Sequence, residues 1–521
     1  MVSESLPPLI CQMLRPGFYP HSTEESIRLI QTHTAYVLLT GEYAYKVKKP
    51  VNYGFLNYST LAARKHYVEA ELRLNQRTAK ELYLETVAID CHAGIFGFFG
   101  DRDPVEYAVK MQQFPDGSLF SDLLEQQQLT PKLMQALAHE VADFHDRAAI
   151  SDRTFGTVSQ IRKAFDENYS QSQSYIGRGQ TQQQLRETQA FSDQAFTQWR
   201  TRFQTRIQQH KIRECHGDLH LRNICYWQHR IFLFDCIEFN DALRHVDTMY
   251  DVAFTVMDCD ARGRSDLGNA FLNTYLEDTG DWEGLTVLPL YLSRQAYVRA
   301  KVTSFLLDDV TVADKHPQIQ TRARAYYTLA WRYTQPQPGC LVLMSGLSGS
   351  GKSTLARHIA QQVGAVYIRS DAVRKHLAGL SLYQQGGPSL YTPAMTQKTY
   401  DRLRELGVQL ATLGYWVILD AKYDRIAARQ AVIAQAKANH IPISVLVCQA
   451  PLSVLHQRVQ QRSGDITDAT AKLLTSQRAE ALTKEEASLA ISLDTTGEIS
   501  DTVQTAVTKL QSLPFSLVKP P

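Results

Sequence analysis

The stretch Gly346-Leu347-Ser348-Gly349-Ser350-Gly351-Lys352-Ser353-Thr354 fits the pattern G-x-x-x-x-G-K-[ST], which is typical of a phosphate-binding loop. An apolar run at 340–344 precedes it and a helical pattern at 355–363 follows, so we expect strand, loop and helix in that order. The glycines let successive backbone N–H groups turn toward a phosphate at a helix N-terminus. The alternative, a Gly/Ser turn opening an ordinary helix, fits this context poorly. We predict nucleotide-binding roles for Gly346, Ser348, Gly349, Ser350, Gly351, Lys352, Ser353 and Thr354, with Lys352 also catalytic and Ser353 also a Mg²⁺ ligand.

Apolar runs alternate with helical patterns from residue 340 onward, which predicts an α/β unit with a parallel sheet. The runs cover residues 340–344, 365–369, 415–419, 443–448 and 489–493. Ligands of such sheets gather at the carboxyl ends of the strands, where three polar side chains fall. Asp371 is placed to accept a hydroxyl proton, and Arg374, on the same helical face, to hold an anionic acceptor. Asp420 is placed to orient magnesium-bound water.

Two arginines further on, Arg458 and Arg462, lie four residues apart on one expected helix. Such a pair can close over a triphosphate and neutralise developing charge, so we predict a catalytic lid. A solvated helix face is the alternative for this pair, and a helix N-cap is the alternative for Asp371.

A second informative stretch is Cys215-His216-Gly217-Asp218-Leu219-His220-Leu221-Arg222-Asn223-Ile224, followed by an apolar strand that ends at Asp235. Phosphoryl transfer needs a carboxylate near the attacking hydroxyl and ligands for Mg²⁺. The spacing places Asp218 and Asn223 in one tight loop, and Asp235 can reach the same metal. A turn or cap residue is the alternative for Asp218 taken alone.

Over most of residues 30–330 the chain resembles the aminoglycoside phosphotransferase-like kinases, which include choline- and fructosamine-kinase relatives. The resemblance implies a two-lobed α+β protein-kinase-like fold, with Asp218 as catalytic base and with Asn223 and Asp235 as metal ligands. The acidic residues that would bind an aminoglycoside are not assignable, so phosphorylation of antibiotics is not predicted.

The same resemblance implies that Lys46, on an expected hairpin of residues 35–39 and 43–48, contacts ATP. Glu71 is its expected ion-pair partner, with Glu69 as second choice. A solvated basic strand that includes Lys48 is the alternative. No G-x-G-x-x-G pattern precedes this strand, which leaves coverage of the phosphates open.

Residues from about 340 to 500 resemble the P-loop kinases that include polynucleotide kinases, zeta toxins and gluconate kinases. This resemblance implies Asp371 as general base, Arg374 as an acceptor contact, and Arg458 and Arg462 as lid residues. The order of the two halves resembles bacterial fusions described as predicted bifunctional kinases.

Two prolines and a glycine in Trp331–Gly339 predict a domain boundary. We expect a kinase-like domain at 1–333 (N-lobe about 1–111, C-lobe about 118–333), a linker at 334–339 and a P-loop domain at 340–521. Residues 340–521 carry 19 Lys and Arg and 13 Asp and Glu, a net charge of +6; the remainder carries 36 and 40, a net charge of −4. Neither value is a nucleic-acid footprint, although the basic part suits an anionic ligand.

Other local patterns give structural expectations. Ser22 or Thr23 is expected to cap a helix, residues 150–212 to form helices and in part a flexible insertion, and Asp247 and Asp251 to brace the catalytic loop. For the basic residues Arg294, Arg299 and Lys301 we favour a solvated helix face over contact with an anionic substrate.

The predicted function is an ATP- and Mg²⁺-dependent phosphotransferase with two sites, each acting on a hydroxyl of a small-molecule or nucleotide-like acceptor. Two alternatives are a nucleotide-binding regulatory protein with an inactive first domain and a polynucleotide 5′-hydroxyl kinase activity in the second domain. A third is a P-loop ATPase that couples hydrolysis to motion. The segment Asp420-Ala421 disfavours this third alternative, because it lacks the second acidic residue that would help to activate water. We expect a cytoplasmic protein without a membrane partner. Its eight cysteines are scattered and form no C-x-x-C pair, and the sequence shows neither a secretory signal nor an apolar run of membrane length.

Overall fold

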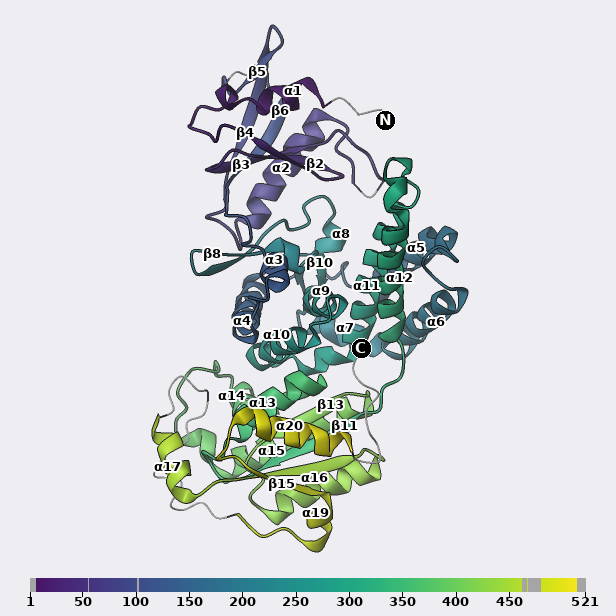
Figure 1. Ribbon diagram of the computed structural model, residues 1–521. Helices are drawn as coiled ribbons and strands as arrows, with labels where there is room; N and C mark the ends of the chain where they lie inside the picture. The colour runs from purple at the N-terminus through teal and green to yellow at the C-terminus, as the bar shows by residue number, and fades with distance from the viewer. Residues whose placement is uncertain (1–5, 55, 101–102, 462–465, 467–478, 513–521) are drawn as a thin grey trace.

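The computed structural model describes residues 6–54, 56–100, 103–461, 466 and 479–512. Figure 1 shows three parts stacked along the molecule: an antiparallel sheet lobe at one end, a helical lobe in the middle and an α/β unit at the other end. We call residues up to 333 the first half and residues from 340 the second half.

The sheet lobe contains a six-stranded sheet in the order β1-β2-β3-β6-β4-β5, antiparallel throughout. Its strands are β1 Arg28–Gln31, β2 Ala35–Leu39, β3 Tyr43–Lys48, β4 Tyr83–His92, β5 Ile95–Gly97 and β6 Glu106–Gln112. Helix α2, Leu61–Asn75, packs on β4 and β6, and Thr60 caps it by accepting a hydrogen bond from the Ala63 N–H. The hairpin expected at 35–39 and 43–48 is confirmed.

The helix expected after Ser22 or Thr23 is wrong. Residues 21–27 form no regular helix, and the next element is strand β1, which pairs antiparallel with β2. The Glu24 N–H donates to the carbonyl of Thr40, at the β2–β3 turn. Pairing with the sheet therefore prevails over the local capping signal. The hydrogen bonds between the strands satisfy backbone N–H and C=O groups that would otherwise bond within a short helix.

The helical lobe surrounds a large apolar core that continues into the second half, where Leu341, Ile368 and Leu419 belong to it. Its helices of six or more residues are α3 Phe120–Glu125, α4 Pro131–Arg147, α5 Val158–Ser172, α6 Gln182–Gln198, α7 Arg200–Gln208, α9 Thr248–Ala261, α10 Ser265–Thr279, α11 Leu288–Phe305 and α12 His316–Arg332. The segment 150–212 is part of this packing and not a loose insertion: Phe165, Leu185 and Phe203 are buried in the core. The hairpin of β8 Ile224–Trp227 and β9 Arg230–Leu233 follows the catalytic-loop motif.

The second half contains a five-stranded parallel sheet in the order β12-β13-β11-β14-β15. The strands are β11 Cys340–Ser345, β12 Val366–Arg369, β13 Trp416–Asp420, β14 Ile443–Gln449 and β15 Ala490–Asp494. The described residues of this half also form helices α13 Lys352–Val363, α14 Ser370–Leu377, α15 Pro393–Thr412, α16 Ile426–Ala438, α17 Leu452–Gln461, α19 Lys484–Leu489 and α20 Ile499–Gln511. All five predicted strands and their parallel arrangement are confirmed.

Helix α10 of the first half lies at the junction between the halves (Figure 1). It packs against α4 and α9 on one side and against α13 and β12 of the second half on the other. The edge strand of the second sheet, β12, is therefore covered by a helix from the first half.

Candidate active sites

Strand β3, helix α2 and the segment after β9 bring three charged residues together in the first half. Lys46 Nζ lies 2.7 Å from Glu71 Oε1 and also pairs with Asp235 Oδ1. Burial lowers the pKa of Lys46, but the two carboxylates outweigh it and hold the pKa well above its ordinary value. The expected pairing of Lys46 with Glu71 is thus observed, whereas Glu69 faces Lys65 on the exposed side of α2.

Lys48 is not on a solvated face. It is 3% exposed, lies 2.7 Å from Glu71 Oε2, and also pairs with Glu238 Oε1. Because side chains two residues apart on a strand share a face, both lysines of β3 reach the same carboxylate. The two lysines outweigh the effect of burial on Glu71 and lower its pKa to about 2. The pattern of alternating lysines was the only sequence signal for Lys48.

The loop between β7 (Ile212–Glu214) and β8 brings Asp218 and Asn223 together. Asn223 Nδ2 donates to the backbone carbonyl of Asp218 at 2.9 Å and lies 3.2 Å from its carboxylate. His220 Nε2 lies 3.4 Å from Asp218 Oδ2. Burial raises the pKa of Asp218, but His220, Arg299 and His216 together outweigh it, so its pKa is below the ordinary value. A carboxylate that is ionised at neutral pH can accept a proton.

Helix α9 holds this loop in place from behind. Asp251 accepts hydrogen bonds from the N–H groups of His216 (2.7 Å) and Gly217 (2.8 Å). Thr255 donates to the carbonyl of Leu219, and Asp258 accepts from the N–H of Leu221. The structural role expected for Asp251 is confirmed.

Asp247 has a structural role as well. It caps α9 by accepting a hydrogen bond from the Met249 N–H, and it pairs with the buried Arg206. Both acidic residues of this segment are thus buried and brace the lobe.

The cations of helix α11 are less exposed than the sequence suggests. Arg294 is 7% exposed, donates to Tyr250 Oη, and stacks over the Tyr250 ring at 4.9 Å. Burial and Arg294 together lower the pKa of Lys301 to about 8. Within the part of the chain that the structure describes, neither residue, nor Arg299, forms an ion pair with a carboxylate. The expectation of a solvated helix face is therefore wrong for Arg294.

In the second half, the phosphate-binding loop adopts backbone conformations that glycine favours. Gly346, Gly349 and Gly351 have φ values of +147°, +80° and +81°. A Cβ atom at Gly346 would approach the carbonyl oxygen of Cys448 to 2.6 Å, and one at Gly349 would approach that of Leu455 to 2.7 Å. Lys352 begins α13, and its Nζ donates to the carbonyl of Leu347 across the loop. The donor set and shape fit a nucleotide phosphate with Mg²⁺ at the Ser353 hydroxyl.

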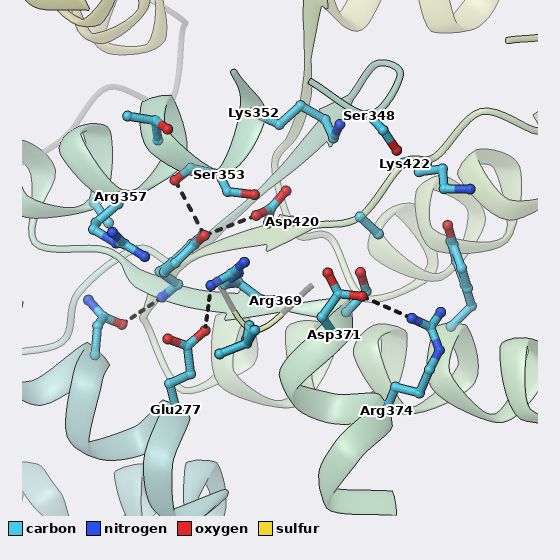
Figure 2. A pocket seen from close by; sticks show the side chains of 18 of the residues that line it. Glu277, Ser348, Lys352, Ser353, Arg357, Arg369, Asp371, Arg374, Asp420 and Lys422 are labelled. Carbon is cyan, nitrogen blue, oxygen red and sulfur yellow. Dashed lines mark hydrogen bonds and ion pairs between the residues drawn. The ribbon is translucent and has the colours of Figure 1, made fainter. Parts of the chain in front are cut away.

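A cavity of about 1280 Å³ opens beside this loop. Ser348, Gly349, Gly351, Lys352, Ser353, Thr354, Asp371, Arg374 and Asp420 are among the residues that line it. Figure 2 shows Asp420 near Ser353 and Lys352, with Asp371 and Arg374 joined by a hydrogen bond of 3.0 Å on the far side. These nine of the predicted residues of this half therefore surround one cavity.

Several predicted residues lie outside that lining. Gly346 and Ser350 belong to the loop but do not face the cavity, and Thr495 donates to the Ser350 carbonyl. Arg458 Nη2 donates to the Thr495 carbonyl at 2.6 Å, and Arg458 is not among the residues that line the cavity. Arg462 lies outside the described residues, so the lid stays a prediction.

The structure also adds residues that the sequence did not single out. Tyr367 Oη donates to Asp420 Oδ2 at 2.9 Å and thereby orients that carboxylate. Arg369, two residues later on β12, and Glu277, from helix α10 of the first half, lie 3.6 Å apart at the cavity wall. Alternation along β12 could have identified Tyr367 and Arg369, but no local pattern connects Glu277 to this site.

Comparison with curated proteins places the chain in a family. The uncharacterized protein Rv2004c of Mycobacterium tuberculosis is 30% identical over 461 residues, which cover 87% of this chain and 90% of the mycobacterial one. The uncharacterized protein Mb2027c of Mycobacterium bovis matches to the same extent. The chain belongs to the family of these mycobacterial proteins. Residues 341–482 match the AAA domain family.

Two solved structures resemble separate parts of the chain. A choline/ethanolamine kinase family protein from Mesorhizobium loti is 11% identical, with 63% of this chain and 99% of that chain covered and a TM-score of 0.38. A gluconokinase from Sinorhizobium meliloti is 20% identical, with 33% and 92% covered and a TM-score of 0.25.

The topology and site geometry together define a two-lobed kinase-like half followed by a P-loop α/β half. In the part of the chain that the structure describes, no helix combines the length and the apolar character needed to cross a membrane.

Proposed function

We propose that the chain is a phosphotransferase with two ATP·Mg²⁺ sites, each of which transfers the γ-phosphoryl group to a hydroxyl of a small-molecule or nucleotide-like acceptor. The observation that carries the proposal is the convergence in each half of an aspartate, a lysine and metal-ligand oxygens. In the first half, Asn223 donates to Asp218 and Lys46 pairs with Asp235, and the Phe234 N–H, next to Asp235, donates to the Asn223 carbonyl. In the second half, Asp371, Lys352, Ser353 and Asp420 line one cavity. Phosphoryl transfer is mostly positioning and charge neutralisation, which such groups supply.

In the first half, Asp218 would accept the acceptor's proton, and Asn223 and Asp235 would hold Mg²⁺. Lys46 would exchange its contact with Asp235 for the phosphates of ATP while it stays paired with Glu71. The buried cation Arg294, with Lys301 and Arg299 near it on α11, supports an acceptor with negative charge. No carboxylate among the described residues pairs with Arg294, and a buried guanidinium in that state gains from an anionic ligand.

In the second half, Asp371 would act as base beside Arg374, and Ser353 and Asp420 would hold Mg²⁺. Among the residues that the structure describes, none forms a hydrogen bond with the buried Nε of Arg374, and this side chain lines the cavity. This supports an acceptor with an oxygen that can accept that hydrogen bond. A polynucleotide 5′-hydroxyl is a narrower variant of this proposal, supported only by the net charge of the second half.

An acceptor screen by mass spectrometry tests the proposal. Full-length Lys352→Ala protein reports on the first site, and Asp218→Asn protein reports on the second. Each is expected to add one phosphate to a distinct set of acceptors. If Asp218→Asn changes no product while Lys352→Ala removes all of them, the first half is a regulatory nucleotide-binding unit and the two-site proposal is wrong.

A further inference from the structure

Helix α10 belongs to the first half but forms one wall of the second half's cavity. Asn269, Asn273, Thr274 and Glu277 line that cavity together with the phosphate-binding loop. Asn273 also accepts a hydrogen bond from the Tyr367 N–H at 2.7 Å and donates to the Ala365 carbonyl at 3.0 Å. Its amide therefore pairs with the free edge of β12, which fixes α10 against the strand that ends at the cavity.

Strand β12 places a positive charge next to the proposed metal ligand. Arg369 is the Cα partner of Asp420 in the parallel pairing of β12 with β13, and it is only 5% exposed. A guanidinium shielded from water at that position attracts the Asp420 carboxylate and repels a divalent cation, unless a nearby negative charge compensates it.

Glu277 is placed to supply that compensation. Its Oε1 lies 3.6 Å from Arg369 Nη1, and Figure 2 shows the carboxylate projecting from α10 toward Arg369, with Asp420 on the other side of the guanidinium. We propose that Glu277 is a positioning residue of the P-loop site: contributed by the kinase-like half, it neutralises Arg369 and so keeps Asp420 available to Mg²⁺. This inference rests on the proposed function of the second half.

Mg²⁺-dependent nucleotide binding tests the proposal without a known acceptor. Full-length protein is titrated with a fluorescent ADP analogue at a series of Mg²⁺ concentrations, and the titration of Lys352→Ala protein is subtracted to remove the signal of the first site. For Glu277→Gln we expect the Mg²⁺ concentration at half-saturation to rise about tenfold, while nucleotide affinity without Mg²⁺ stays unchanged.

The double variant Glu277→Gln/Arg369→Gln is the decisive control, because it removes the cation along with its counter-ion. It is expected to restore the Mg²⁺ dependence of the unmodified protein. Asp266→Asn, at the other end of α10 and outside the cavity lining, is expected to change nothing.

Each other outcome has a defined meaning. An unchanged Mg²⁺ dependence in Glu277→Gln, or a double variant as impaired as the single one, overturns this inference and leaves the proposed function standing. If Glu277→Gln does not fold, Arg369→Gln alone decides: a higher Mg²⁺ requirement in that variant overturns the inference, and an equal or lower one supports it. If the unmodified protein shows no Mg²⁺-dependent binding beyond the Lys352→Ala reference, both proposals are wrong.

Discussion

Lys48 Nζ lies 2.7 Å from Glu71 Oε2, so a single buried carboxylate binds both lysines of strand β3. Lys48 also pairs with Glu238, which connects the sheet lobe to the segment that follows Asp235. The ion pair expected of a kinase-like lobe is thus extended here into a buried network.

The first prediction concerns this network. Lys48→Met leaves the buried Glu238 without its cation and leaves Glu71 with Lys46 alone, so we expect the sheet lobe to lose about 3–5 kcal/mol of stability. Hydrogen exchange of the β3 amides measures the change locally. Lys49→Met is the matched control: Lys49 lies over the Tyr36 ring near the surface, and its loss is expected to cost less than about 1 kcal/mol. Equal effects of the two substitutions would contradict the importance of the network.

The second prediction concerns the pH dependence of the first site. His220 lowers the pKa of Asp218, so the carboxylate is ionised to a lower pH than it would be alone. In His220→Asn the pKa of Asp218 should rise, and the acidic limb of the pH–rate profile should move to higher pH. His229→Asn, in the turn between β8 and β9, is expected to leave the profile in place. An unmoved acidic limb in His220→Asn would show that Asp218 does not limit the rate.

The third prediction concerns the support of the catalytic loop. The two carboxylate oxygens of Asp251 accept one hydrogen bond each from the N–H groups of His216 and Gly217. The side-chain amide of Asn has one oxygen and can accept only one of these two hydrogen bonds. One buried N–H left unpaired costs about 1–3 kcal/mol, so we expect Asp251→Asn to lower first-site turnover by about ten- to a hundredfold. Faster hydrogen exchange at residues 216 and 217 should accompany the loss. Asp143→Asn, on the exposed face of α4, serves as the control.

The fourth prediction concerns the phosphate-binding loop. Gly349→Ala adds a Cβ 2.7 Å from the Leu455 carbonyl, so the loop must shift, and we expect nucleotide affinity at the second site to fall by more than about tenfold. Gly379 also has a positive φ, of +68°, but open space around it. Gly379→Ala therefore carries the same backbone strain of about 1–2 kcal/mol without crowding the loop, and should bind nucleotide normally. Isothermal titration calorimetry measures the nucleotide affinity of both variants in protein that also carries Asp235→Asn. Equal affinities for Gly349→Ala and Gly379→Ala would contradict the steric argument.

Local spacing was enough to predict the second half, because the phosphate-binding motif specifies its own backbone and the strands are continuous apolar runs. The convergence of Lys46, Glu71 and Asp235 involves distant parts of the chain and came from resemblance to a family. Where the sequence misled, a partner distant in the sequence decided the outcome: the helix after Ser22 gave way to pairing with β2, and Lys48 and Arg294 became buried. Glu277 could not be predicted, because its role depends on a contact between the two halves.

The cover that α10 provides for β12 has a consequence for attempts to divide the protein. Produced without residues 1–333, the P-loop unit would lose the Asn273 amide, which hydrogen-bonds to the Tyr367 N–H and the Ala365 carbonyl. It would then expose an unpaired strand edge to the solvent. Such an edge can pair with the same edge of another copy, so we expect the isolated fragment to self-associate. Helix α10, which joins the two halves, thus also protects the protein against aggregation.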